Sequence, residues 1–122
     1  MKWIWLAAGG ALGAGSRYFF QQVLAGVMPG YPLGTFTANF LGSLVIGFLV
    51  PHMTDMNPRF QIFLVTGYLG ALTTLSSYVM EVMVMAQEKR WLAAVTHWAG
   101  GSLICLLGCV IGYWLGSRLV AA

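Results

Sequence analysis

The stretch that decides the fold is GYLGALTTLSSYVME, residues 67 to 81. It lies inside an apolar run long enough to cross a bilayer, yet it contains two glycines, a cluster of Thr and Ser side chains and a carboxylate. An unsatisfied polar group is costly in the hydrocarbon core, so polar or irregular backbone survives there only where protein buries it or where it lines an ion path. The stretch therefore predicts a broken membrane helix that carries a functional site.

The composition around this stretch is that of an integral membrane protein. Of the 122 residues, 59% are hydrophobic and 7% are charged, whereas a soluble domain carries about a quarter charged residues. At about 20 residues per span, the chain has room for four helices. Proline and charge clusters place them at roughly residues 3–27, 33–50, 60–86 and 91–115. We predict an all-α, multi-pass membrane protein that forms a single domain (1–122), without nucleic-acid binding.

Glycines recur at four-residue spacing in the first and last of these helices. The pattern comprises Gly9 and Gly13, and then Gly108, Gly112 and Gly116. Small residues at this spacing form a ridge that allows another helix to approach closely. The glycines therefore predict tight helix packing, and nothing about chemistry.

The loop charges specify the orientation in the membrane only weakly. With four spans, Lys2, Arg59 and Arg118 lie on one side, and Lys89 and Arg90 lie on the other. This is almost no positive-inside bias. Two alternatives follow: the chain inserts in both orientations and forms an antiparallel dimer, or one or two charges suffice to orient it.

Polar side chains form stripes at membrane depth on three helices. The stripes are Thr35, Asn39 and Ser43 on the second helix, Thr74, Ser77 and Glu81 on the third, and Trp98 and Ser102 on the fourth. Steps of three and four residues place each set on one helix face. Ser and Thr in membranes usually bond to neighbouring helices, but the amide of Asn39 is harder to satisfy there. The stripes together favour a polar track through the protein.

The chemistry of this track favours an anion. Amide, hydroxyl and indole groups and the membrane-depth Arg17 are hydrogen-bond donors. Glu81 is the only carboxylate expected at this depth, so a row of acidic cation sites is missing. A broken helix also presents the positive end of its dipole to an anion and free carbonyl groups to a cation.

Three segments resemble the Fluc (CrcB) family of fluoride channels. They are GALGAGSR at residues 10–17, GTFTANFLGS at residues 34–43 and GYLGALTTLSSY at residues 67–78. The resemblance covers nearly the whole chain. It implies a subunit of four transmembrane helices with a broken third helix, in an antiparallel, dual-topology dimer with two pores. Such a dimer exports fluoride from the cytoplasm through the inner (plasma) membrane by passive electrodiffusion.

The resemblance also implies roles for individual residues. Asn39 is expected to donate to fluoride, while Arg17 draws anions into a vestibule. The pathway is expected to continue along Thr35, Ser43, Thr74, Leu75, Ser77, Tyr78, Glu81, Trp98 and Ser102. A structural sodium ion at the dimer centre is expected to bind the backbone carbonyls of Gly70 and Thr73 from each subunit.

The chain departs from the family pattern at two places. The family usually has two phenylalanines in the third helix, whose positive ring edges face the anion; here Leu75 and Tyr78 hold these positions. Leucine has no ring, whereas tyrosine keeps one and adds a hydroxyl that can donate. In the last helix, His97 and Trp98 replace a common asparagine–tyrosine pair. We interpret His97 as a hydrogen-bonded packing residue, with a pH-sensing role as the alternative.

Several alternatives remain open at this point. The chain is a homodimeric channel with a modified aromatic gate, one half of a heterodimeric channel, or a relative that has lost rapid conduction. A small multidrug-type exporter, also with four spans and dual topology, needs a carboxylate in its first helix, where this chain has Arg17. Catalysis is not expected, because His97 and Ser102 lie five residues apart on one helix and point in different directions. A purely structural membrane subunit is the last alternative.

Overall fold

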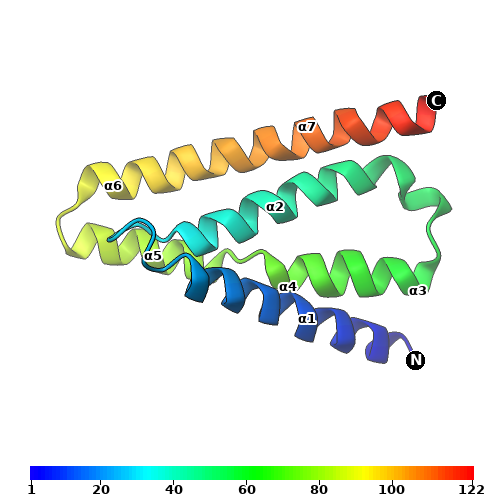
Figure 1. Cartoon of the computed structure of the whole chain (residues 1–122), viewed down its shortest axis with the longest axis horizontal. Helices are drawn as coiled ribbons and strands as arrows, with labels where there is room; N and C mark the ends of the chain where they lie inside the picture. The colour runs from blue at the N-terminus through cyan, green and yellow to red at the C-terminus, as the bar shows by residue number, and fades with distance from the viewer.

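The computed structural model describes residues 1–122, and all of its regular elements are helices (Figure 1). Helix α1 (Lys2–Val23) is followed by a connector, residues 24–32. Helix α2 (Leu33–Leu49) then runs back and continues into a short 3₁₀ helix, η1 (Val50–Asp55). The first helix ends earlier than residue 27, because the chain turns at Leu24 towards Pro29 and Gly30, and Gly30 has a φ of +79°.

The third and fourth rods of the molecule are each built from several helical pieces. The third contains α3 (Pro58–Gln61), the π-helix η2 (Ile62–Leu69), α4 (Gly70–Leu72) and α5 (Ser76–Gln87). The predicted break lies at residues 73–75, between α4 and α5. The fourth contains α6 (Trp91–Val95), the π-helix η3 (Thr96–Gly100) and α7 (Gly101–Ala121). Helix α7 continues past the predicted end at residue 115 to Ala121, and Arg118 Cζ lies 4.8 Å from the centroid of the Trp114 ring one turn earlier.

The four rods lie side by side with alternating direction (Figure 1). Both termini and the η1 connector lie at one end, and the two remaining connectors, residues 24–32 and 88–90, lie at the other. Helix α2 packs against α7, and α1 packs against η2 and α4. Three rods, Leu33–Asp55, Pro58–Gln87 and Trp91–Ala121, are long and apolar enough to cross a membrane.

Glycines bring these helices into backbone contact, as the sequence predicted. A Cβ atom on Gly9 would lie 2.0 Å from the carbonyl oxygen of Phe63 in η2. A Cβ atom on Gly112 in α7 would lie 2.1 Å from the carbonyl oxygen of Leu44 in α2. No real Cβ atom fits at such distances, so these helix pairs are packed as closely as their backbones allow.

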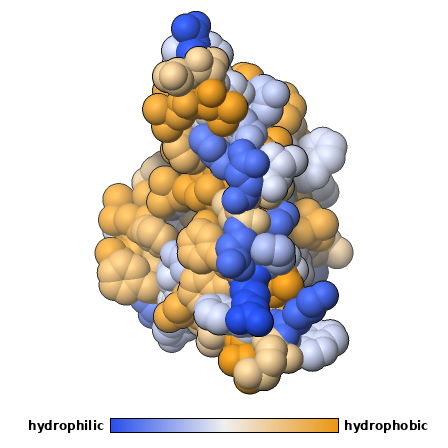
Figure 2. All heavy atoms as spheres, turned by 90° about the vertical axis from the view of Figure 1, so that its right-hand side faces the viewer, coloured by the Kyte–Doolittle hydropathy of each residue, from blue (hydrophilic) through white to orange (hydrophobic).

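The side chains on the outer surface of the four-rod bundle are mostly apolar. On α7 they include Leu103, Leu106, Leu107 and Val110, all more than half exposed. Figure 2 shows the end that carries the termini: hydrophilic atoms run down the middle of this face, and hydrophobic atoms lie beside them. Apolar flanks with polar ends are the surface of a protein that spans a bilayer.

Candidate functional site

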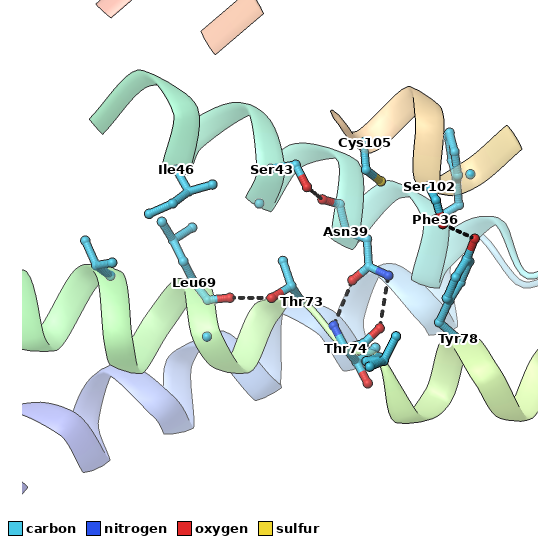
Figure 3. Close-up of a pocket in the computed structure, with 15 residues that line it drawn as sticks. Phe36, Asn39, Ser43, Ile46, Leu69, Thr73, Thr74, Tyr78, Ser102 and Cys105 are labelled. Atoms are coloured by element: carbon cyan, nitrogen blue, oxygen red, sulfur yellow. Dashed lines mark hydrogen bonds between the residues drawn. The ribbon is translucent and has the colours of Figure 1, made fainter. Parts of the chain in front are cut away.

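The break in the third rod is held by Asn39 of α2. Its Oδ1 accepts a hydrogen bond from the Thr74 N–H at 2.7 Å, and its Nδ2 donates to the Thr74 carbonyl oxygen at 3.1 Å (Figure 3). The side-chain amide thus replaces the backbone hydrogen bonds that Thr74 loses where the helix opens. One proton on Nδ2 has no partner within the chain and is free for another acceptor.

The break also frees two backbone carbonyl groups. Neither Gly70 nor Thr73 accepts a hydrogen bond at its carbonyl oxygen from the following turn, because Thr74 N–H bonds to Asn39 and Ser77 N–H bonds to the Thr74 hydroxyl. Thr73 itself is extended, with φ −81° and ψ 149°. These oxygens are two acceptors that a bound ion or a partner could use.

A hollow of about 520 Å³ lies between α2, the break and the start of α7; we call it the first hollow. Its polar lining consists of Asn39, Ser43, Thr73, Thr74, Tyr78, Ser102 and Cys105 (Figure 3). Ser43 Oγ donates to the Asn39 carbonyl at 2.7 Å, and Ser102 Oγ donates to the Trp98 carbonyl at 2.7 Å. Because these hydroxyl protons are used, Asn39 is the clearest free donor in this hollow.

Leu75 and Tyr78, which stand where the family usually has phenylalanines, both line the first hollow but differ in burial. The ring of Tyr78 is buried, and its hydroxyl lies 2.6 Å from the His97 carbonyl oxygen and 3.1 Å from Ser102 Oγ. A phenol has one proton, and here a backbone carbonyl accepts it. Leu75 lines the same hollow, but it is 74% exposed, at the open side of the hollow in the single chain.

A second hollow, of about 460 Å³, lies towards the end with connectors 24–32 and 88–90. Thr35 and Glu81 line it, together with Gln21, Tyr31 and others. Thr35 is buried; its hydroxyl donates to Glu81 Oε1 at 2.5 Å and accepts from Gln21 Nε2 at 3.1 Å. The stripe on α2 therefore serves both hollows, with Thr35 at the second and Asn39 and Ser43 at the first.

His97 lies behind Glu81 and is fully buried. Its Nε2 is 3.2 Å from Glu81 Oε2, and its Nδ1 is 3.0 Å from the Tyr31 hydroxyl. Both ring nitrogens are satisfied, which confirms the prediction of a hydrogen-bonded packing residue. Burial raises the pKa of Tyr31 above its usual value, and nearby Tyr78 and Glu81 add to the shift, so Tyr31 keeps its proton.

Three residues predicted on the track line neither hollow. Trp98 is 60% exposed and its indole N–H makes no hydrogen bond. Ser77 contributes its backbone N–H, which donates to the Thr74 hydroxyl at 3.2 Å. Arg17 makes no ion pair or side-chain hydrogen bond within the chain. The sequence analysis missed Gln21 and Tyr31, although the glutamine pair at 21–22 interrupts an apolar run.

Comparison with known proteins links the whole chain to one family. The family model described as CrcB-like protein, Camphor Resistance (CrcB), matches residues 4–113, which include the break and both hollows. The fluoride-specific ion channel FluC of Helicobacter pylori (strain HPAG1) is 38% identical over 123 residues, covering 96% of this chain and 94% of that protein. The protein of the same name from Acinetobacter baumannii (strain AYE) is 36% identical over 119 residues, covering 93% and 94%.

Proposed function

The chain belongs to the CrcB family, and on this basis we propose that it is a fluoride-specific ion channel. The observation that carries the proposal is the likeness, over almost the full length, to relatives named as fluoride-specific ion channels. In a channel the ion moves passively down its electrochemical gradient and no bond is made or broken. The protein therefore releases fluoride from the cytoplasm across the plasma membrane.

The first hollow supplies groups that suit a small, strongly hydrated anion. Asn39 lines it and keeps one Nδ2 proton without a partner in the chain, and the amino end of α5 begins at Ser76, next to the break. The positive end of a helix dipole attracts anions. Replacing the water around fluoride by fixed donors is the step that gives a channel its selectivity.

We propose that all four rods cross the membrane and that two copies pair in opposite orientations. Helix α1 is 22 residues long and runs alongside the others (Figure 1), which supports a fourth crossing. Positive charges are divided between the two ends, with Lys2, Arg59 and Arg118 at one and Lys89 and Arg90 at the other. A second copy over the first hollow would turn an open surface into an enclosed pathway.

The freed carbonyls at the break fit a structural sodium ion. Gly70 is exposed, and a Cβ atom there would meet nothing closer than 3.8 Å. With the oxygens of Gly70 and Thr73 from two copies, four carbonyl ligands could surround one ion. Hard cations such as sodium prefer oxygen ligands. In this assembly the ion would tie the two breaks together at the dimer centre.

A heterodimer is the second candidate assembly. Leu75, at a position where the family usually has a phenylalanine, is 74% exposed and offers no ring to an anion. A non-identical partner subunit could supply the missing aromatic edge. The homodimer is preferred because this chain alone offers the donors at the first hollow and the freed carbonyls.

Fluoride efflux from liposomes that contain this chain alone tests the proposal. We expect fast efflux on a fluoride electrode, no comparable chloride efflux, and no efflux from protein-free liposomes. No efflux from a folded dimer would contradict the homodimeric channel. Co-reconstitution with a second family member from the same genome would then separate a missing partner from loss of conduction.

A further inference from the structure

Five side chains from five segments form one hydrogen-bonded chain around Glu81. They are Gln21 of α1, Tyr31 of the first connector, Thr35 of α2, Glu81 of α5 and His97 of η3. No other polar network in the molecule joins so many segments. A buried polar network costs stability when some of its members lack a partner. In this network each of the five side chains has a hydrogen-bond partner.

The proton positions in this network follow from its chemistry. An ionised Glu81 only accepts, so Thr35 must donate to Oε1 and His97 must carry its proton on Nε2 to donate to Oε2. Nδ1 of His97 is then an acceptor, and the Tyr31 hydroxyl donates to it. Thr35 and His97 thus donate to the two oxygens of one carboxylate, which fixes the orientation of Glu81 where it lines the second hollow.

His97 also contacts Tyr78, a residue that lines the first hollow. Its ring lies 4.7 Å from the ring of Tyr78, centroid to centroid, and its carbonyl oxygen accepts the Tyr78 hydroxyl. Tyr78 lines the first hollow, whereas Glu81 lines the second and is 18% exposed at its side chain. His97 is therefore a buried residue that contacts Tyr78, which lines the first hollow, and Glu81, which lines the second.

We propose that His97 is a positioning residue for ion conduction and makes it dependent on pH. This inference rests on the proposed fluoride channel. With a neutral ring and an ionised Glu81, the His97–Glu81 pair carries one negative charge, which opposes an anion in the second hollow. When the ring takes up a proton, the pair becomes an imidazolium–carboxylate pair with no net charge, and anions pass more easily.

Few other charges face this pair. The titratable groups around His97 are Glu81 and Tyr78 from α5 and Tyr31 from the connector, while α2 and α1 contribute the uncharged Thr35 and Gln21. Farther out in the second hollow, Glu88 and Arg90 pair with each other at 3.4 Å. Cys105 of α7 lines the first hollow. A change of charge on His97 is therefore not offset by a neighbouring lysine or arginine.

The test compares fluoride efflux at about pH 5.5 and about pH 7.5, with protein-free liposomes subtracted at each pH. For the wild type we expect efflux to rise on the order of tenfold on acidification, because a proton on His97 neutralises the net charge of the His97–Glu81 pair beside the second hollow. In His97→Gln the amide can still donate to Glu81 and accept from Tyr31 but cannot titrate, so the ratio should fall to about one. The inference is overturned if efflux from His97→Gln rises on acidification as much as efflux from the wild type does. It is also overturned if efflux from the wild type does not rise.

Two further variants control for effects of pH on efflux that do not depend on the His97–Glu81 pair. His52→Gln makes the same change at the other histidine, in η1 at the opposite end, and should keep the wild-type ratio. Glu81→Gln removes the counter-ion that a fully buried imidazolium needs, so the His97 ring should stay neutral and efflux should not rise on acidification. A Glu81→Gln channel that still responds to acidification would contradict the inference even if His97→Gln does not fold.

If the proposed channel function is wrong, the efflux measurements give a different result from the one expected when only the inference about His97 is wrong. No efflux from the wild type at any pH would contradict the proposed function, and ¹⁵N NMR of the imidazole rings would then test separately whether His97 takes up a proton, the step on which the pH dependence relies. The chain has two histidines, so the spectrum of His97→Gln assigns the His97 signal. A His97 ring that keeps one protonation state between about pH 5 and pH 8 would overturn the inference.

Discussion

The third rod is held in two different ways along its length. Where η2 and α4 meet α1, the contact runs through glycine backbones, with Gly9 against Phe63 and Gly13 against Tyr68. A few residues on, the unwound segment 73–75 is held chiefly by the amide of Asn39. Close backbone packing on one side of the break therefore supports the irregular, polar segment that persists beside it at membrane depth.

The glycine contacts should therefore tolerate change least. In Gly9→Ala the new Cβ would lie 2.0 Å from the Phe63 carbonyl oxygen, so α1 must move away. We expect a loss of about 1–3 kcal/mol or more, read as a lower unfolding temperature in detergent. Gly10→Ala is the matched control, because no atom lies within 4 Å of its Cβ position. Equal stability of the two variants would contradict the close packing of α1 on η2.

The Asn39 anchor should affect conduction more than assembly. Asn39→Ala removes both hydrogen bonds to Thr74 and the free donor, so we expect fluoride efflux to fall by about tenfold or more, with the dimer intact by size-exclusion chromatography. Asn57→Ala is the matched control, because it makes the same change at an exposed residue that lines neither hollow, and its efflux should stay at the wild-type level. Wild-type efflux in Asn39→Ala would remove this residue from the pathway.

The smallest effect is expected at Tyr78, where the ring and the hydroxyl have separate roles. Tyr78→Phe keeps the buried ring and loses the bond to the His97 carbonyl, for a cost of about 1 kcal/mol in unfolding free energy. Efflux should change little, since the hydroxyl proton is not free for an ion. Tyr113→Phe, at an exposed position on α7, is the control for both measurements. A large loss of efflux in Tyr78→Phe alone would show that the hydroxyl contacts fluoride.

Much of this arrangement could be predicted from local sequence. Gly, Thr and Ser inside an apolar run predicted the break, and the four-residue glycine spacing predicted close packing. The partners of the polar residues could not be predicted, because Asn39 bonds to Thr74 and His97 bonds to Tyr31, far away in the chain. These pairings depend on tertiary structure, which no local pattern encodes.

The π-helix η3 lies across the predicted stripe of Trp98 and Ser102. Both side chains are exposed, as expected for residues on one face, but only Ser102 lines the first hollow. The π-helix η3 ends between them, at Gly100, and changes the side-chain register. Its sequence, Thr-His-Trp-Ala-Gly, has no feature that distinguishes it from an α-helical segment.

Because the Thr74 N–H is bonded to Asn39, hydrogen exchange at the Thr74 backbone amide reports on the motion of the third rod at its break. Thr74 lies outside any helix, yet its proton is buried and donated at 2.7 Å to Oδ1. Its exchange with deuterium therefore requires α5 and the break to separate from α2. The half-life of this single proton would report how often the unwound segment leaves its anchor.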